Sequence, residues 1–185
     1  MDKTNILSDE ACIARVTGGD TEAFGLLVAR YNDKLIRMLM LMVGDRCNAE
    51  DLAQEVMIKA FTGLDSFHGH CSFSTWLYRI AYNKAVSDMR KKRNRYTEVP
   101  LNDSILQVED DDDETETVTE SPETLRWALA QLDPKDQTLL SLYYGEGKSV
   151  SELSLIAGQS PSNIKIRLFR LRNKLKKIMS AYEER

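Results

Sequence analysis

The chain has 185 residues, enough for one ordinary domain or two small helical ones. Hydrophobic residues make up 42% and charged residues 29%, so a core can be buried and wholesale disorder is excluded. The formal net charge of −4, taken alone, argues against a nucleic-acid-binding protein, whose footprint is usually basic. Three cysteines, an odd number, do not make a disulfide framework and suit a reducing cytosol.

The N-terminal segment has no apolar region of the kind found in secretion signals. The most apolar stretch, residues 35–43, is far too short to span a bilayer. We therefore expect a cytoplasmic protein that does not insert into a membrane.

The charge is distributed very unevenly along the chain. Residues 1–95 carry a net charge of +2, residues 96–121 a net −10 with no basic side chain, and residues 122–185 a net +4. A block of like charge repels itself and stays extended, so residues 96–121 are predicted to be a flexible acidic linker. The chain is thus expected to hold two net-basic domains, at 1–95 and 122–185.

The basic side chains also cluster. Five of the six residues at 90–95 are basic, and residues 165–177 hold seven basic side chains and no acidic one. Either cluster alone also fits a solvated helix face. Two clusters, one in each domain, favour a polyanionic partner.

Strand signals are nearly absent from the first domain, and apolar residues recur at helical spacing. Ser8 is predicted to cap a short helix that ends at Gly18. Asp20 is predicted to cap a second helix, which ends at Gly44. Its apolar stripe comprises Phe24, Leu27, Val28, Tyr31, Leu35, Met38, Leu39 and Met42.

Two further helices are predicted over residues 46–62 and 72–95, with a loop containing glycine and histidine between them. The helix at 46–62 is expected to face the core with four apolar side chains, Leu52, Val56, Met57 and Ala60. A different face of this helix gathers residues at i, i+3, i+4 and i+7 spacing, namely Asp51, Gln54, Glu55 and Ile58. The simplest interpretation of this face is an exposed acidic surface that binds a basic partner.

The second domain carries clear helix-start signals. Ser121, Asp133 and Ser160 each precede a proline at a first helical position. Ser149 and Glu152 have the spacing of a capping box. Four short helices result, and the last two, at about 149–157 and 160–180, form a helix-turn-helix. An inward stripe of the last helix comprises Ile164, Leu168, Leu171, Leu175 and Ile178.

The second helix of such a motif reaches base edges in the major groove with its N-terminal residues. Here Lys165 can donate to guanine, while Ser162 and Asn163 can bond bases or phosphate. Arg167, Arg170 and Lys174 remain for phosphates.

Residues 64–80 are rich in aromatic side chains and precede a basic helix end, a combination that suits single-stranded DNA. Phe73, Trp76, Leu77 and Ile80 have helical spacing and are expected mainly in the core, which leaves Phe67 and the loop as contact candidates. The loop also holds His68, His70 and Cys71, but three ligands crowded into four residues fit a structural zinc site poorly. No metal, cofactor or enzyme motif is predicted.

Three segments together resemble the extracytoplasmic-function (ECF) branch of bacterial sigma factors. They are residues 48–61 (NAEDLAQEVMIKAF), 73–83 (FSTWLYRIAYN) and 164–172 (IKIRLFRLR). The resemblance implies a noncatalytic all-helical protein with two DNA-binding domains, the C-terminal one a helix-turn-helix. It also implies core RNA polymerase, through its β′ clamp and β flap, as a partner, together with promoter DNA and an anti-sigma factor.

The resemblance assigns roles by position. Asp51, Gln54, Glu55 and Ile58 would contact the polymerase. The −10 element would be bound by Phe67, His68, His70, Ser72, Ile80, Asn83, Arg90, Lys91, Lys92 and Arg93, with a flipped base held by Phe67, the loop to Ser72, Ile80 and Asn83. The −35 element would be bound by Ser162, Asn163, Lys165, Arg167, Phe169, Arg170 and Lys174.

Two features depart from the family pattern. Position 166 is isoleucine, where many members have serine, and the loop sequence His-Gly-His-Cys is unusual. The linker would either thread a basic polymerase channel or act only as a solubilising tether. Two other interpretations remain open: a dimeric repressor or activator that binds operators alone, and a metal-sensing regulator that uses the His-Cys loop.

Overall fold

The computed structural model describes residues 7–96 and 121–183, and the side chains of 7–92 and 121–182. These residues form helices and turns without a strand, which confirms the predicted all-helical fold. Residues 97–120 of the predicted linker lie outside the described residues. No helix in the two described ranges is long and apolar enough to cross a membrane.

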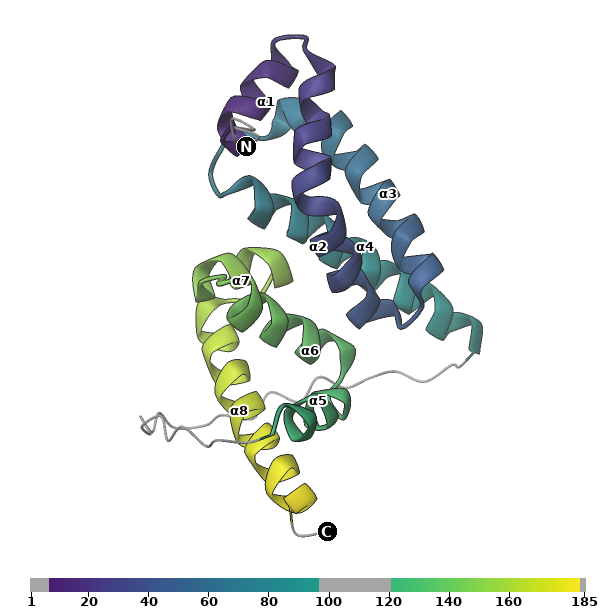
Figure 1. The fold of residues 1–185 in the computed structure, drawn as a ribbon, viewed down its shortest axis with the longest axis vertical. Helices are drawn as coiled ribbons and strands as arrows, with labels where there is room; N and C mark the ends of the chain where they lie inside the picture. Colours follow the sequence, from purple (N-terminus) through teal and green to yellow (C-terminus); the bar gives the residue numbers. More distant parts are fainter. Residues whose placement is uncertain (1–6, 97–120, 184–185) are drawn as a thin grey trace, which may run out of the picture.

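The N-terminal half contains four α-helices, drawn in purple to teal in Figure 1. They are α1 (Asp9–Thr17), α2 (Phe24–Val43), α3 (Arg46–Thr62) and α4 (Phe73–Tyr96). Short 3₁₀ turns, Thr21–Ala23 and Leu64–Ser66, join α1 to α2 and follow α3. Helices α2, α3 and α4 pack against one another and form the body of this half.

Local signals explain most of these helix ends. The Ser8 hydroxyl accepts a hydrogen bond from the Ala11 N–H at 3.2 Å and caps α1 as predicted. Gly44 ends α2 with φ +70°, a left-handed conformation that glycine adopts without a Cβ clash. Asp45, just beyond it, caps α3 through the Asn48 N–H at 2.7 Å.

The predicted cap at Asp20 is wrong. Residues Thr21–Ala23 form a 3₁₀ turn, α2 begins only at Phe24, and Asp20 makes no capping hydrogen bond. Its carboxylate instead accepts hydrogen bonds from Arg15 at the end of α1, at 2.5 and 2.9 Å. Both bonds go to Oδ2, so a charged partner five residues earlier holds this carboxylate toward the end of α1.

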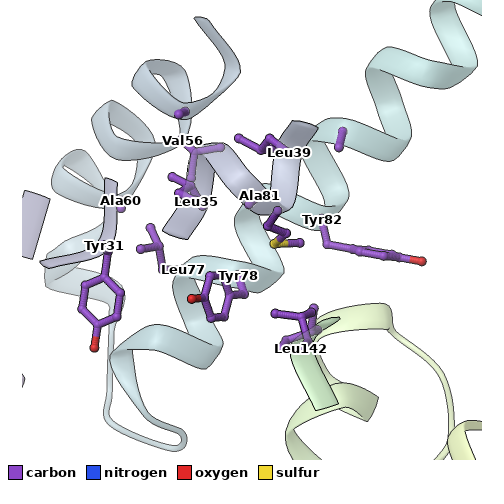
Figure 2. Close-up of a cluster of buried hydrophobic side chains, with 14 of the residues drawn as sticks. Tyr31, Leu35, Leu39, Val56, Ala60, Leu77, Tyr78, Ala81, Tyr82 and Leu142 are labelled. Atoms are coloured by element: carbon purple, nitrogen blue, oxygen red, sulfur yellow. The ribbon is translucent and has the colours of Figure 1, made fainter. Parts of the chain in front are cut away.

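The core of this half follows the predicted stripes. Figure 2 shows Leu35 and Leu39 of α2, Val56 and Ala60 of α3, and Leu77 and Ala81 of α4 among the clustered side chains. Leu35, Leu39, Leu77 and Ala81 are fully buried. The inward residues predicted for α3 are all buried as well.

The C-terminal half contains α5 (Pro122–Ala130), α6 (Pro134–Leu140), α7 (Val150–Ala157) and α8 (Pro161–Glu183), green to yellow in Figure 1. A π-helical segment, Ser141–Gly145, extends α6. Ser149 and Glu152 form the predicted capping box of α7. Gly158, at φ +65°, turns the chain from α7 into α8, which completes the helix-turn-helix.

The two halves pack directly against each other, an arrangement that the sequence did not indicate. Helix α7 lies on α4, and α6 lies on α2. Leu142 of the π-helical segment is 2% exposed and lies beside Tyr78 and Tyr82 of α4 (Figure 2). The hydrophobic core therefore continues from one half into the other.

Candidate nucleic-acid interface

The outer face of α3 presents the acidic surface expected from its spacing. Asp51, Gln54, Glu55 and Ile58 are all exposed, and Ile58 is 63% accessible despite being apolar. Glu55 forms an ion pair with Lys84 of α4. The face is therefore a solvent-facing patch whose edge meets α4.

A cavity of about 300 Å³ lies where α3 and α4 meet. Three basic side chains and one amide contribute to its wall, which comprises Lys59, Trp76, Arg79, Ile80, Asn83, Lys84 and Ser87. Of these, only Ile80 and Asn83 were predicted as site residues. The positive charge of the wall suits phosphate, and the Asn83 amide can donate to or accept from a base edge.

A second cavity, of about 250 Å³, lies beside it under the loop before α4. It is lined by Ser66, Phe67, His68, His70, Cys71, Thr75, Trp76, Arg79 and, from α7, Leu155. The Phe67 ring lies 5.1 Å from that of Trp76 and 6.0 Å from that of Phe73, centroid to centroid. Phe67 is half-buried, whereas His68 and His70 are exposed.

The predicted −10 residues therefore do not surround one pocket. Phe67, His68 and His70 line one cavity, while Ile80 and Asn83 line the other. Trp76 and Arg79 contribute to both walls. Trp76, expected mainly in the core, is only half-buried because it forms this partition.

Sequence reasoning missed Lys59, Trp76, Arg79 and Lys84 as members of this surface. A signal for two of them was present, since Trp76, Arg79, Ile80 and Asn83 have the i, i+3, i+4 and i+7 spacing of one helix face. Lys59 comes from the neighbouring helix, so its place in the wall depends on how α3 packs against α4.

Ser72 is assigned to the −10 site by resemblance but lines neither cavity. Its hydroxyl lies 3.3 Å from Glu152 Oε1 and 3.5 Å from Lys148 Nζ, both in the C-terminal half. It therefore faces the junction between the halves.

The basic end of α4 is solvent-facing. Arg90, Lys91 and Lys92 are exposed, and Lys92 pairs with Asp88 at 3.3 Å. Burial by itself would raise the pKa of Asp88, but hydrogen bonds from Asn48 and Lys92 outweigh it and lower the pKa. The side chain of Arg93 lies outside the described residues.

The start of α8 displays most of the predicted −35 residues. Ser162, Asn163 and Lys165 are exposed in its first turns, as are Arg170 and Lys174 further along. Ile164, Leu168 and Leu171 are buried on the opposite side and fix this orientation. Phe169 is half-buried.

Arg167 is already engaged within the protein. Its guanidinium lies 2.7 Å from Asp136 Oδ1 of α6. Burial raises the pKa of the Tyr82 phenol in α4, and the charge of neighbouring Arg167 offsets part of that rise. To contact a DNA phosphate, Arg167 would have to leave its ion pair with Asp136.

The cysteines are unpaired, with Cys12 buried, Cys47 exposed and Cys71 half-buried. Burial raises the pKa of the Cys71 thiol. Within residues 7–96 and 121–183, no three His, Cys, Asp or Glu side chains come together in a way that could hold a metal ion.

Both halves match known protein families. Residues 27–95 match sigma-70 region 2, and residues 123–175 match sigma-70 region 4. The chain is 34% identical to the ECF RNA polymerase sigma factor SigW of Bacillus subtilis, over 89% of this chain and 93% of that protein. It is 33% identical to the ECF RNA polymerase sigma-E factor of Haemophilus influenzae, over 94% of this chain and 98% of that protein.

The fold is also similar to solved structures. CnrH in complex with the cytosolic domain of CnrY superposes with a TM-score of 0.65 at 23% identity, covering 94% of this chain and 97% of CnrH. The sigma factor RpoE of Bartonella quintana, in complex with the anti-sigma factor NepR, gives a TM-score of 0.64 at 23% identity, covering 85% and 96%.

Proposed function

The chain belongs to the extracytoplasmic-function family of RNA polymerase sigma factors, and on this premise we propose how its residues divide the work of promoter recognition. Sigma factors bind core RNA polymerase and direct it to promoters. We assign polymerase and −10 binding to a domain at 1–95 and −35 binding to a domain at 122–185, with 96–121 as the acidic linker.

The acidic face of α3 is the proposed polymerase contact. Its carboxylates, Asp51 and Glu55, are exposed, and Ile58 adds an accessible apolar side chain. Exposed acid around an apolar centre suits a basic protein surface such as the proposed β′ clamp.

One observation carries the −10 assignment. Two adjacent cavities on α4 combine the cations Lys59, Arg79 and Lys84 with the aromatic rings of Phe67 and Trp76. Unpaired bases stack on rings while cations follow the phosphate backbone, so this surface suits one separated DNA strand better than a duplex. It also borders the proposed polymerase face through the Glu55–Lys84 ion pair.

The exposed start of α8 is the proposed −35 reader. Ser162, Asn163 and Lys165 lie in the turns that a helix-turn-helix inserts into the major groove. Arg170 and Lys174 are placed to contact phosphates. Ile166, half-buried, is not assigned a base contact.

These roles consist of binding and require no catalytic group or cofactor, so we infer that the protein is not an enzyme. It would act in the cytoplasm, where bacterial polymerase works. An anti-sigma factor is the proposed inhibitor, supported by the similar folds of RpoE, solved with the anti-sigma factor NepR, and of CnrH, solved with the cytosolic domain of CnrY.

Reconstituted transcription tests the proposal. Core polymerase with this protein is mixed with a genomic fragment library, and transcript ends are sequenced. We expect RNA from start sites that core polymerase alone ignores. Absence of such transcripts, together with tight operator binding that needs no core polymerase, would instead support a repressor or activator.

The polymerase face has its own test. The double variant Asp51→Lys and Glu55→Lys reverses the charge of the α3 face and should reduce core binding by at least tenfold, because close charge pairs at interfaces are worth about 1.5 kcal/mol or more. Glu22→Lys, at an exposed position outside this face, is the matched control. Unchanged core affinity of the double variant, measured by anisotropy of labelled protein, rejects this interface.

A further inference from the structure

Lys148 lies at the junction between the halves and is unusually buried for a lysine. Only 9% of it is accessible, although it follows a loop of small and polar residues. Its ammonium lies 2.6 Å from Ser74 Oγ and 3.2 Å from Thr75 Oγ1, both in the first turn of α4. It also lies 5.8 Å from the centre of the Tyr78 ring.

Glu152 completes the network from the first turn of α7. Its carboxylate accepts hydrogen bonds from Thr75 Oγ1 at 2.6 Å, Lys148 Nζ at 3.1 Å and the Ser149 N–H at 3.0 Å. Burial by itself would raise the pKa of Glu152, but these bonds outweigh it and lower the pKa to about 2.

The network spans elements that are far apart in sequence. Lys148 and Glu152 belong to the helix-turn-helix half, whereas Ser74 and Thr75 belong to α4 and Ser72 directly precedes that helix. A buried ammonium is tolerated only when hydrogen-bond partners replace water, and most of the partners of Lys148 come from the opposite half. The ion pair between Lys34 of α2 and Glu146, at 2.8 Å, also joins the two halves.

The junction overlaps the surface assigned to −10 DNA. Leu155 of α7 lines the same cavity as Phe67, His68 and His70. Ser72, also assigned to this DNA, is bonded to Glu152 and Lys148. A DNA strand that used this cavity and Ser72 would meet α7.

We propose that this contact is an autoinhibitory latch, in which α7 and the −10 strand compete for the first turns of α4. The inference rests on the proposed function of the α4 cavities. In the closed chain, Lys148 and Glu152 hold Ser72, Ser74 and Thr75, and Leu155 covers one side of the loop cavity. Promoter binding requires the helix-turn-helix half to leave α4.

The test uses the full chain with Lys148→Glu, which places a carboxylate next to Glu152 and removes the ammonium from the α4 hydroxyls. Arg126→Glu makes the same charge change at an exposed position of α5 and is the matched control. Leu155→Ser provides a second route, because this side chain is already 44% exposed and its replacement leaves the core of the half unchanged. Circular dichroism checks that each variant is folded.

Two readouts are measured without polymerase: the radius of gyration from X-ray scattering, and the affinity for a fluorescent single-stranded −10 oligonucleotide from a promoter that the wild-type holoenzyme transcribes. If the closed form outnumbers the open form by about ten to one, opening tightens DNA binding by about tenfold. We expect that gain and a larger radius for Lys148→Glu, a smaller gain for Leu155→Ser, and neither for Arg126→Glu.

The two proposals fail differently. If the wild-type holoenzyme transcribes but both junction variants match the wild type in radius and oligonucleotide affinity, the latch is wrong and the sigma assignment stands. If no promoter is transcribed, the −10 assignment fails, and an unchanged radius in Lys148→Glu would independently reject the latch.

Discussion

Glu152→Gln isolates the charge of the junction carboxylate. Glutamine keeps the length and one acceptor oxygen but cannot ionise. The pKa of Glu152 falls from an ordinary 4.5 to about 2, and at about 1.4 kcal/mol per unit this corresponds to roughly 3.5 kcal/mol at most. Because 29% of the side chain is exposed, solvent screening reduces the expected loss at pH 7 to about 1–2 kcal/mol.

The pH dependence gives the sharper check. A carboxyl group whose pKa is lowered in the folded state stabilises that state above its unfolded pKa, and this contribution disappears as pH falls through the folded pKa. The stability difference between wild type and Glu152→Gln should therefore be full at pH 7, begin to shrink below about pH 5 and vanish near pH 2.

Urea unfolding followed by circular dichroism at pH 7, 5, 4 and 3 measures this difference. Glu123→Gln, in the exposed first turn of α5, is the matched control and should show little change at any pH. A difference that stays constant from pH 7 to pH 3 would show that Glu152 acts through packing or capping geometry, and the electrostatic reasoning would be refuted.

Two further substitutions test the helical scaffold. Leu39→Ala removes a fully buried side chain between α2, α3 and α4, and urea unfolding should show a loss of about 2–5 kcal/mol; a loss below 1 kcal/mol would mean that the core is looser than described. Gly44→Ala forces a Cβ into the left-handed conformation at φ +70° and should cost about 1 kcal/mol, whereas Gly25→Ala, inside α2 with open space around its Cβ position, should be neutral or stabilising in the same assay.

Much of the fold could be predicted from local signals. The third helix was predicted at about 46–62, and α3 spans Arg46–Thr62. Its start is capped by Asp45 and its end lies at Gly63. The predicted capping box of Ser149 and Glu152 is present as well. The family and its promoter-directing function, inferred from three short segments, are confirmed by the matches to sigma-70 regions 2 and 4.

The remaining features depend on contacts between distant residues. Asp20 has the chemistry of a cap, but Arg15 competes for its carboxylate. Lys59 enters the α4 cavity only because α3 packs beside α4. Lys148 lies in a polar loop, so its local sequence predicts a solvent-exposed side chain. Its hydrogen-bond partners Ser74 and Thr75, however, lie 74 and 73 residues away in the sequence. Site roles assigned by resemblance alone stay predictions.

Several faces of helix α4 each have a structural or proposed binding role. Leu77 and Ala81 face the core, Trp76 and Asn83 the cavities, and Thr75 and Tyr78 the other half. A substitution in α4 during evolution would therefore alter more than one of three properties together: core packing, the cavity walls and the contact between the halves. The exposed loop carrying His68 and His70 is less constrained, so related proteins that diverge in promoter preference should vary first in this loop.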